Sequence, residues 1–204
     1  ANGSGGLARL PEGRQEGLNT VHQYRFNTDT GRLTPNDPPE VRPKDLDGPR
    51  HYRFHPTKSL MYMSNEQGGS VTVYALDAAR GTLTARQTIS TLPEGYSGRK
   101  LCSQIHMHPE GMHLYVGNRG HDSIASFAID ESTGELTATG WTQVGPVPRA
   151  FGLDPTGNFL YVTSLELGSM ISFRVDQRSG GLTRLDTYEV GSLPMWVLIT
   201  DLAI

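Results

Sequence analysis

A unit of about fifty residues repeats along this chain, and it constrains the fold more than any other feature. Each repeat closes with the tetrapeptide Gly-x-Leu-Thr, which begins at Gly31, Gly81, Gly134 and Gly180. These glycines lie 50, 53 and 46 residues apart. A repeat of this length that is made only of short strands is typical of a β-propeller blade.

Three landmarks keep the same positions within each repeat. A His-Pro or Asp-Pro pair follows the first predicted strand, a segment with a central Tyr forms the second, and an alternating apolar and polar segment that ends in Asp forms the third. The pairs begin at His55, His108 and Asp154, and the third strands are predicted at 71–77, 124–130 and 171–176. Because His55 and His108 take the place of Asp154, we predict that they cap turns. With a fourth strand after each Gly-x-Leu-Thr motif, the pattern indicates four antiparallel strands per blade.

The repeats predict an all-β fold, a partial β-propeller of about three complete four-stranded blades plus two partial ones. The complete blades cover residues 48–192, and residues 21–26 with those from Leu33 onward supply the third and fourth strands of an earlier blade. Residues 193–199 are predicted to form the first strand of a further blade. The propeller segment thus covers residues 18–204. Residues 1–17 are rich in glycine and polar, so we predict a flexible arm there.

An open half-ring would expose two apolar blade faces, because a repeat unit buries its faces only against its neighbours. Three hypotheses follow from this expectation. The chain is a piece of a longer protein, or it associates with a second copy of itself to complete the ring, or it is a relative that has lost part of the ring.

Composition excludes several classes of partner and cofactor. The formal net charge of -3 gives no reason to expect binding to nucleic acid or to a membrane surface. Cys102 is the only cysteine, which favours a reducing compartment and a cytoplasmic location, and its apolar strand predicts a place in the core. The chain has no zinc-type spacing of Cys or His, no calcium-loop pattern and no glycine-rich phosphate loop. We therefore predict no metal and no other cofactor.

The same landmarks predict which polar residues share one edge of the blades. In an antiparallel pair the first strand begins where the second one ends, so residues five before and eleven after each landmark should meet. These positions hold Arg50, Ser103 and Arg149, and Glu66, Arg119 and Leu165. Three arginines and one glutamate at one mouth of the channel predict a site for a small anionic substrate, because guanidinium binds carboxylate or phosphate with two hydrogen bonds. The alternative for each residue alone is a solvated rim position or a structural ion pair.

Several motifs around these positions carry a family resemblance. They are Gly-Pro-Arg-His at 48–51, Ser-Asn-Glu at 64–66, Thr-Ile-Ser-Thr-Leu-Pro-Glu-Gly at 88–95 and Gly-Asn-Arg-Gly-His-Asp-Ser at 117–123. Together they resemble the C-terminal half of the seven-bladed propeller lactonase family, which includes bacterial 6-phosphogluconolactonases and fungal carboxymuconate lactonizing enzymes. The resemblance covers residues 18–200.

The resemblance implies roles for individual residues. Glu66, Arg50 and Arg119 match the family's catalytic carboxylate and its two site arginines, and we add Arg149, His51, His121 and Gln104 as substrate-binding candidates. The chain departs from the family at Ala150, where a histidine usually follows Pro-Arg, and at Gln104, where an acidic residue is common. A further family histidine belongs to an earlier blade that this chain does not contain.

Two classes of function stay open at this point. The first is an enzyme, either a lactonase-like hydrolase acting on a small anionic sugar lactone such as 6-phosphogluconolactone or a lactone-forming muconate cycloisomerase. The second is a non-catalytic propeller segment that binds an anion or takes part in assembly.

Overall fold

A computed structural model describes residues 19–44 and 46–201, so the arm predicted at 1–17 lies outside the described residues. Within them, fourteen strands form one two-stranded and three four-stranded antiparallel sheets. The two-stranded sheet contains β1 (Val21–Phe26) and β2 (Leu33–Val41). The larger sheets are β3 (Pro49–Phe54), β4 (Leu60–Asn65), β5 (Ser70–Asp77) and β6 (Thr82–Ser90); β7 (Cys102–Met107), β8 (His113–Asn118), β9 (Ser123–Ile129) and β10 (Leu136–Gln143); and β11 (Pro148–Leu153), β12 (Phe159–Ser164), β13 (Ser169–Val175) and β14 (Leu182–Glu189).

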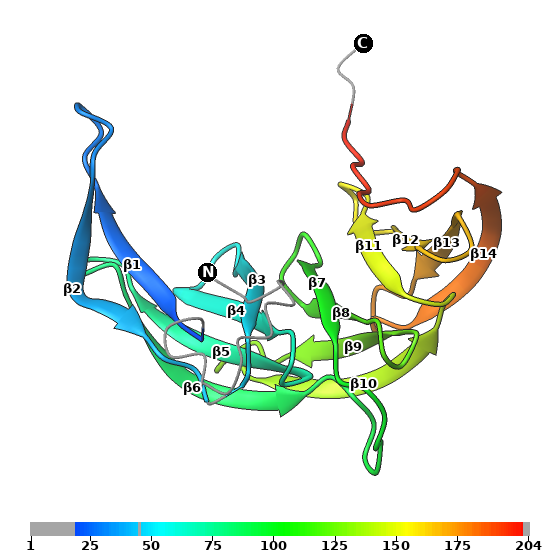
Figure 1. Cartoon of the computed structure of the whole chain (residues 1–204), viewed down its shortest axis with the longest axis horizontal. Helices are drawn as coiled ribbons and strands as arrows, with labels where there is room; N and C mark the ends of the chain where they lie inside the picture. Colours follow the sequence, from blue (N-terminus) through cyan, green and yellow to red (C-terminus); the bar gives the residue numbers. More distant parts are fainter. Residues whose placement is uncertain (1–18, 45, 202–204) are drawn as a thin grey trace, which may run out of the picture.

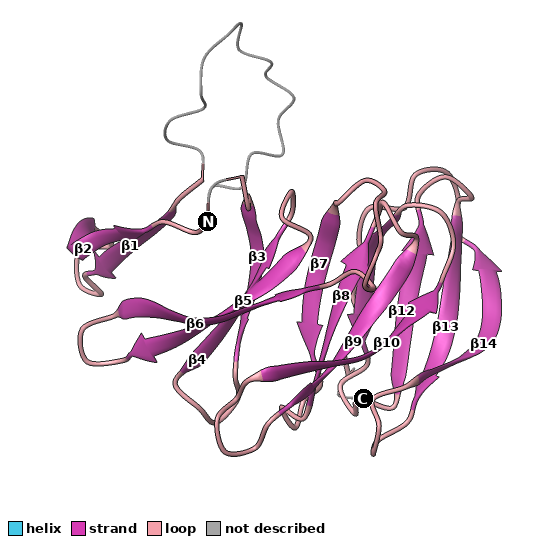
Figure 2. Ribbon diagram, turned by 90° about the horizontal axis from the view of Figure 1, so that it is seen from below, coloured by secondary structure: helices cyan, strands magenta, loops and turns pink. Residues whose placement is uncertain are grey.

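The sheets are arranged as the blades of a half-ring. In each four-stranded sheet the strands pair in chain order. Figure 1 shows β3, β7 and β11 on the inner side of the half-ring and β6, β10 and β14 on the outer side. In Figure 2 the three complete blades stand side by side, with loops along both edges. The predicted all-β fold, a partial β-propeller with three complete blades, is confirmed.

The two partial blades differ from each other. β1 and β2 confirm the predicted third and fourth strands of an earlier blade. The strand predicted at 193–199 is wrong, because no residue from 190 to 201 belongs to a strand. The segment does run along the inner strands of the last blade, where Thr163 Oγ1 donates to Pro194 O over 3.4 Å. A strand needs a hydrogen-bonded partner, and none of the described residues supplies one.

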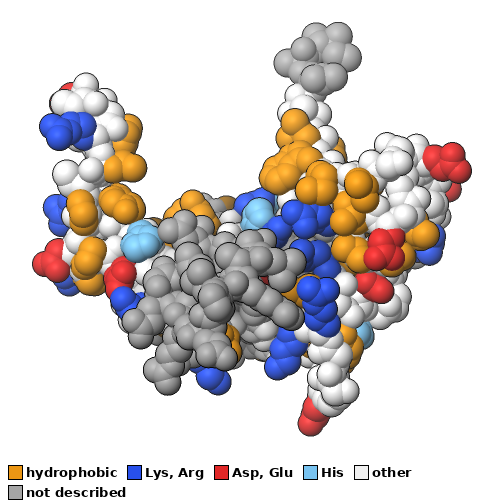
Figure 3. Space-filling model, viewed as in Figure 1, with side chains coloured by type: hydrophobic (Ala, Val, Ile, Leu, Met, Phe, Trp, Pro, Cys, Tyr) orange, Lys and Arg blue, Asp and Glu red, His pale blue; other side chains and the backbone are white. Residues whose placement is uncertain are grey.

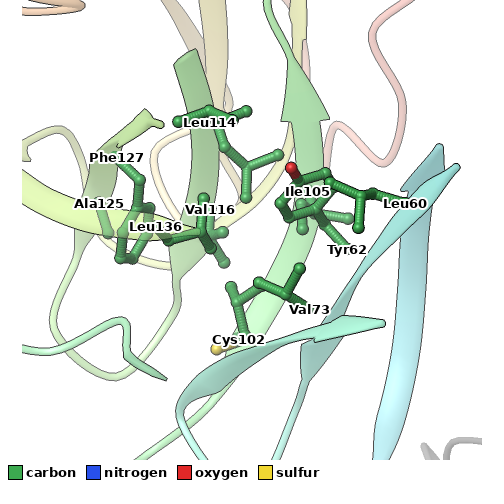
Figure 4. Close-up of a cluster of buried hydrophobic side chains, with 12 residues drawn as sticks. Leu60, Tyr62, Val73, Cys102, Ile105, Leu114, Val116, Ala125, Phe127 and Leu136 are labelled. Atoms are coloured by element: carbon green, nitrogen blue, oxygen red, sulfur yellow. The ribbon is translucent and has the colours of Figure 1, made fainter. Parts of the chain in front are cut away.

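The hydrophobic core lies between blades rather than within one. The cluster in Figure 4 joins Tyr62 and Val73 of one blade to Ile105 and Leu114 of the next, and its side chains are almost fully buried. A second cluster joins the second complete blade to the third in the same way, around Phe151. Successive side chains along a strand point to opposite faces of the sheet. Each blade can therefore present one apolar face to each of its two neighbours.

Hydrogen bonds repeat across the same boundaries. Tyr62 OH donates to Gly134 O over 2.8 Å, and Tyr115 OH donates to Gly180 O over 2.9 Å. In both cases the acceptor opens the Gly-x-Leu-Thr motif of the following blade. The predicted turn caps are also confirmed: His55 Nδ1 accepts from the backbone N–H of Thr57 and of Lys58 at 3.2 and 3.1 Å. The repeat motif therefore marks the place where one blade binds the next.

The two ends of the half-ring leave apolar side chains exposed. Tyr52 and Phe54 of β3 are 43% and 51% exposed, and they pair with Met63 and Met61, which pack against the remnant blade. That blade has only β1 and β2, so nothing in the described residues covers the inner part of this face. At the other end Trp196 is 64% exposed.

We predict that Tyr115→Phe lowers the free energy of unfolding by about 1–2 kcal/mol, because it leaves the buried Gly180 carbonyl without its donor. Thermal or urea unfolding of the variant would measure this change. Tyr24→Phe is the matched control, since Tyr24 lies 52% exposed and is expected to leave stability unchanged. Equal stability of wild type and Tyr115→Phe would contradict the assignment.

Candidate active site

Each inner strand begins with an irregularity in its pairing. Between one pair of matched residues and the next, the inner strand contains one residue more than its partner strand. The extra residue is Arg50 in β3, and it falls within Ser103–Gln104 in β7 and Arg149–Ala150 in β11. An extra residue of this kind is a β-bulge, which redirects side chains and is common beside functional sites. The bulges thus occur at the positions that the landmarks selected.

Glu66 is the carboxylate at the centre of the candidate site. It follows β4, is 6% exposed, and its backbone N–H donates to Gly48 O over 2.7 Å. Its Oε2 lies 3.3 Å from Arg50 Nε, and its Oε1 accepts a hydrogen bond from Arg119 Nη2. The predicted meeting of these three residues is therefore present in the structure.

Both arginines are also tied to the start of β7. Arg50 Nη1 donates to Ser103 O over 2.6 Å, and Arg119 Nη2 donates to Cys102 O over 2.9 Å. Burial lowers the pKa of Arg50, the Glu66 charge opposes that shift, and Arg119 and Arg149 add to it. The two guanidinium groups are held by backbone carbonyls as well as by Glu66, so the geometry is fixed from two blades.

Two buried polar atoms at this site make no hydrogen bond within the described part of the chain. They are Glu66 Oε2, beside Arg50, and Arg119 Nε. Buried polar atoms in proteins are normally satisfied, and those that are not often serve binding or catalysis. One buried acceptor and one buried donor thus lack a hydrogen bond at the same place.

Arg149 adds positive charge without a carboxylate partner in the described ranges. It is half-buried at the start of β11, and its charge acts on Arg50. Ser103 Oγ donates to Pro148 O over 2.7 Å, which joins the start of β11 to that of β7. Figure 3 shows Lys and Arg side chains gathered in the middle of this face, beside a histidine. Three arginines around one glutamate leave a net positive charge that attracts anions.

The two histidine candidates, His51 and His121, have different surroundings in the structure. Burial lowers the pKa of His51 to about 4, Arg50 and Arg53 lower it as well, and Glu66 opposes them. His51 is therefore neutral at pH 7, and the charges of Arg50 and Glu66 act on it. His121 instead has Nδ1 at 2.8 Å from Ser123 Oγ, with its ring edge-on to Tyr96 at 4.9 Å.

Gln104 belongs to a network that the sequence reasoning did not identify. Its Oε1 accepts the Phe151 N–H over 3.1 Å and lies 3.3 Å from His106 Nε2, while His106 Nδ1 lies 3.4 Å from Arg53 Nη2. Burial, followed by the charges of Arg53 and His51, lowers the pKa of His106 to about 3. Arg53 and His106 each stand two residues before a His-Pro landmark, so the same counting would have paired them.

The described residues contain no group of three or more His, Cys, Asp or Glu side chains that could hold a metal ion. They also contain no helix that could span a membrane. Cys102 is fully buried, and burial raises the pKa of its thiol to about 11. Its predicted place in the core is confirmed, and a protonated, inaccessible thiol is no nucleophile.

Comparison with known proteins gives consistent matches. A 6-phosphogluconolactonase from Cronobacter sakazakii is 36% identical over 127 residues, which is 62% of this chain and 38% of that relative. The periplasmic gluconolactonase of Pseudomonas aeruginosa superposes with a TM-score of 0.81 at 32% identity, over 86% of this chain and 50% of its own. A Bacteroides fragilis protein superposes with a TM-score of 0.82 at 29% identity, over 91% and 52% of the two chains.

The chain spans about half the length of the solved structures that it matches, and less of the Cronobacter relative. A family model described as Lactonase, 7-bladed beta-propeller matches residues 15–199, which is most of the sequence. The matched segment includes all three complete blades and every candidate site residue. On this evidence the chain belongs to the seven-bladed β-propeller lactonase family.

Proposed function

We propose that this chain contributes the site of a hydrolase that opens small anionic sugar lactones, such as 6-phosphogluconolactone. The observation that carries the proposal is the buried Glu66 between Arg50 and Arg119, with Arg149 close to Arg50. The names of two relatives support it, since one is a 6-phosphogluconolactonase and the other a gluconolactonase. A carboxylate that can accept a proton and arginines that can hold negative charge are what lactone hydrolysis needs.

In the proposed reaction, a water oxygen bonds to the lactone carbonyl carbon while Glu66 Oε2 accepts one of its protons. The carbonyl oxygen becomes an oxyanion, and Arg119 Nε, which has no hydrogen-bond partner among the described residues, donates to it. The carbonyl then re-forms as the ring C–O bond breaks. The leaving oxygen takes the proton back from Glu66, so water has been added and Glu66 is again ionised.

Negative charge beside the reacting carbonyl would be held by the other two arginines of this site. Arg50 is tied to Ser103 O through one nitrogen, and Arg149 meets no carboxylate in the described part of the chain. A planar guanidinium binds carboxylate and phosphate oxygens in pairs, which orients the substrate as well as attracting it. His51, neutral at pH 7, can donate or accept a hydrogen bond beside them without adding charge.

Binding without turnover is the second candidate, and two departures from the family favour it. Ala150 stands where a histidine is usual, and Gln104, in place of an acidic residue, uses its Oε1 for Phe151 and His106. A site that lacks these proton-transfer groups would keep its arginines and bind the anion. The Glu66 experiment below distinguishes the two candidates.

We also infer that the protein works in the cytoplasm. The support is the single buried cysteine, which has no partner for an internal disulfide. One relative is periplasmic. Cell fractionation with an antibody against the protein would test this location.

We predict that Glu66→Gln lowers kcat/KM for 6-phosphogluconolactone by at least about a hundredfold, because the variant keeps the shape but cannot accept a proton. The rate would be measured above spontaneous hydrolysis. Glu110→Gln, in an exposed turn after β7, is the matched control and should retain full activity.

Glu66→Gln also leaves two buried arginines without their carboxylate, so thermal unfolding must accompany the assay. Glu66→Asp keeps the charge and is expected to fold and retain partial activity. A folded Glu66→Gln with the wild-type rate would remove Glu66 from the mechanism. A wild type that binds 6-phosphogluconate without hydrolysing the lactone would favour the binding function.

A further inference from the structure

We propose that Arg53, oriented by His106, forms a second anion-binding subsite for a charged group at the far end of the substrate from the lactone. This inference rests on the proposed function and deepens it by assigning the residues that hold an additional phosphate or carboxylate of the substrate. The subsite is separate from the arginines that contact Glu66.

Arg53 and Arg50 lie on the same strand, and their side chains reach the same neighbouring blade. Arg50 Nη1 meets Ser103 O at the start of β7, and Arg53 Nη2 meets His106 near its end. Their backbone positions are three residues apart in β3, which is at most about 10 Å because the bulge at Arg50 shortens the strand. A six-carbon acid with charged groups near both ends can span that distance.

The hydrogen bonds around His106 determine which of its nitrogens carries the proton. The Phe151 N–H must donate, so the Gln104 atom that faces it is an oxygen, and the same oxygen faces His106 Nε2. His106 Nε2 therefore carries the hydrogen, and Nδ1 presents its lone pair to Arg53 Nη2. The ring is also packed on Phe151 with centroids 4.6 Å apart.

This arrangement fixes Arg53 without neutralising it. Its Nη2 faces a neutral imidazole, and its Nη1 donates to the Tyr52 carbonyl over 2.9 Å. No carboxylate of the described residues pairs with it, whereas Arg50 and Arg119 share Glu66. Arg53 is half-buried, and burial lowers its pKa. An arginine that has further N–H donors and no paired carboxylate can bind the oxygens of a carboxylate or phosphate.

His51 connects the two positive centres. The charges of both Arg50 and Arg53 act on it, and His51 in turn acts on His106. The inner strand thus carries Arg50, neutral His51 and Arg53 in succession beside β7. A ligand with two negative groups would complement both arginines, whereas a ligand with one would use only the Glu66 end.

We predict that His106 is in the Nε2–H form at pH 7 and keeps this form down to about pH 4, because its folded pKa is about 3. The groups that face it are Arg53 and His51 from β3, Gln104 from β7 and Phe151 from β11. Nitrogen-15 NMR of the histidine rings measures the tautomer and its titration. An Nδ1–H ring, or protonation near pH 6.5, would contradict the geometry.

The subsite itself is tested by calorimetric binding of three acids to the complete protein. They are 6-phosphogluconate, with a terminal phosphate, glucarate, with a second carboxylate, and gluconate, with neither. We expect Arg53→Met to weaken binding of at least one of the first two by about tenfold to a hundredfold and to change gluconate binding by less than threefold. His106→Phe should show a smaller loss with the same selectivity, as expected of a positioning residue. Arg178→Met, in an exposed turn, is the matched control.

Each outcome decides the question. If Arg53→Met weakens binding of 6-phosphogluconate alone, the subsite takes a phosphate. If it weakens binding of glucarate alone, the subsite takes a carboxylate, and if it weakens binding of both, the subsite takes either anion. An equal loss for all three acids, no loss for any, or no binding to wild type overturns the proposal. Binding is measured without turnover, so a protein that does not hydrolyse lactones would refute the proposed activity and still allow the subsite to be judged. Thermal unfolding of each variant identifies any that fail to fold.

Discussion

Contact between neighbouring blades is the interaction on which the rest of this structure depends. The apolar clusters lie across blade boundaries, and the buried tyrosines of one blade donate to turn glycines of the next. A single four-stranded sheet could not bury both of its faces. The repeat in the sequence is therefore a repeat of contacts, and the rigid spacing of the inner strands follows from it.

The candidate site uses this spacing directly. Its charged residues come from three consecutive blades, and each lies where an inner strand begins or a second strand ends. Glu66 receives Arg50 from its own blade and Arg119 from the next, so the ion-pair network can form only after the blades have packed. Buried charges of this kind are costly unless paired, which makes the packed interface and the charge network mutually dependent.

Much of this arrangement could be predicted by counting residues. The offsets from the His-Pro landmarks placed Arg50 beside Glu66 because strand pairing in a blade is regular. Counting failed where regularity ends: residues 193–199 match a strand pattern but have no strand partner among the described residues. The Arg53–His106 contact was missed because the counting was applied only to strand ends at the mouth of the channel, whereas these two residues each stand two positions before a His-Pro landmark.

The bulge at the start of each inner strand has a consequence for how such a protein can change over evolution. Side chains alternate between faces with a period of two, so removing the extra residue would shift one side of the bulge to the opposite face. In β3 the extra residue is Arg50 itself, so that change would remove the arginine that lies against Glu66. A substitution changes one side chain here, whereas a change of length by one residue would move every side chain on one side of the bulge to the opposite face. The number of residues in this stretch is thus under tighter constraint than the identity of most of them.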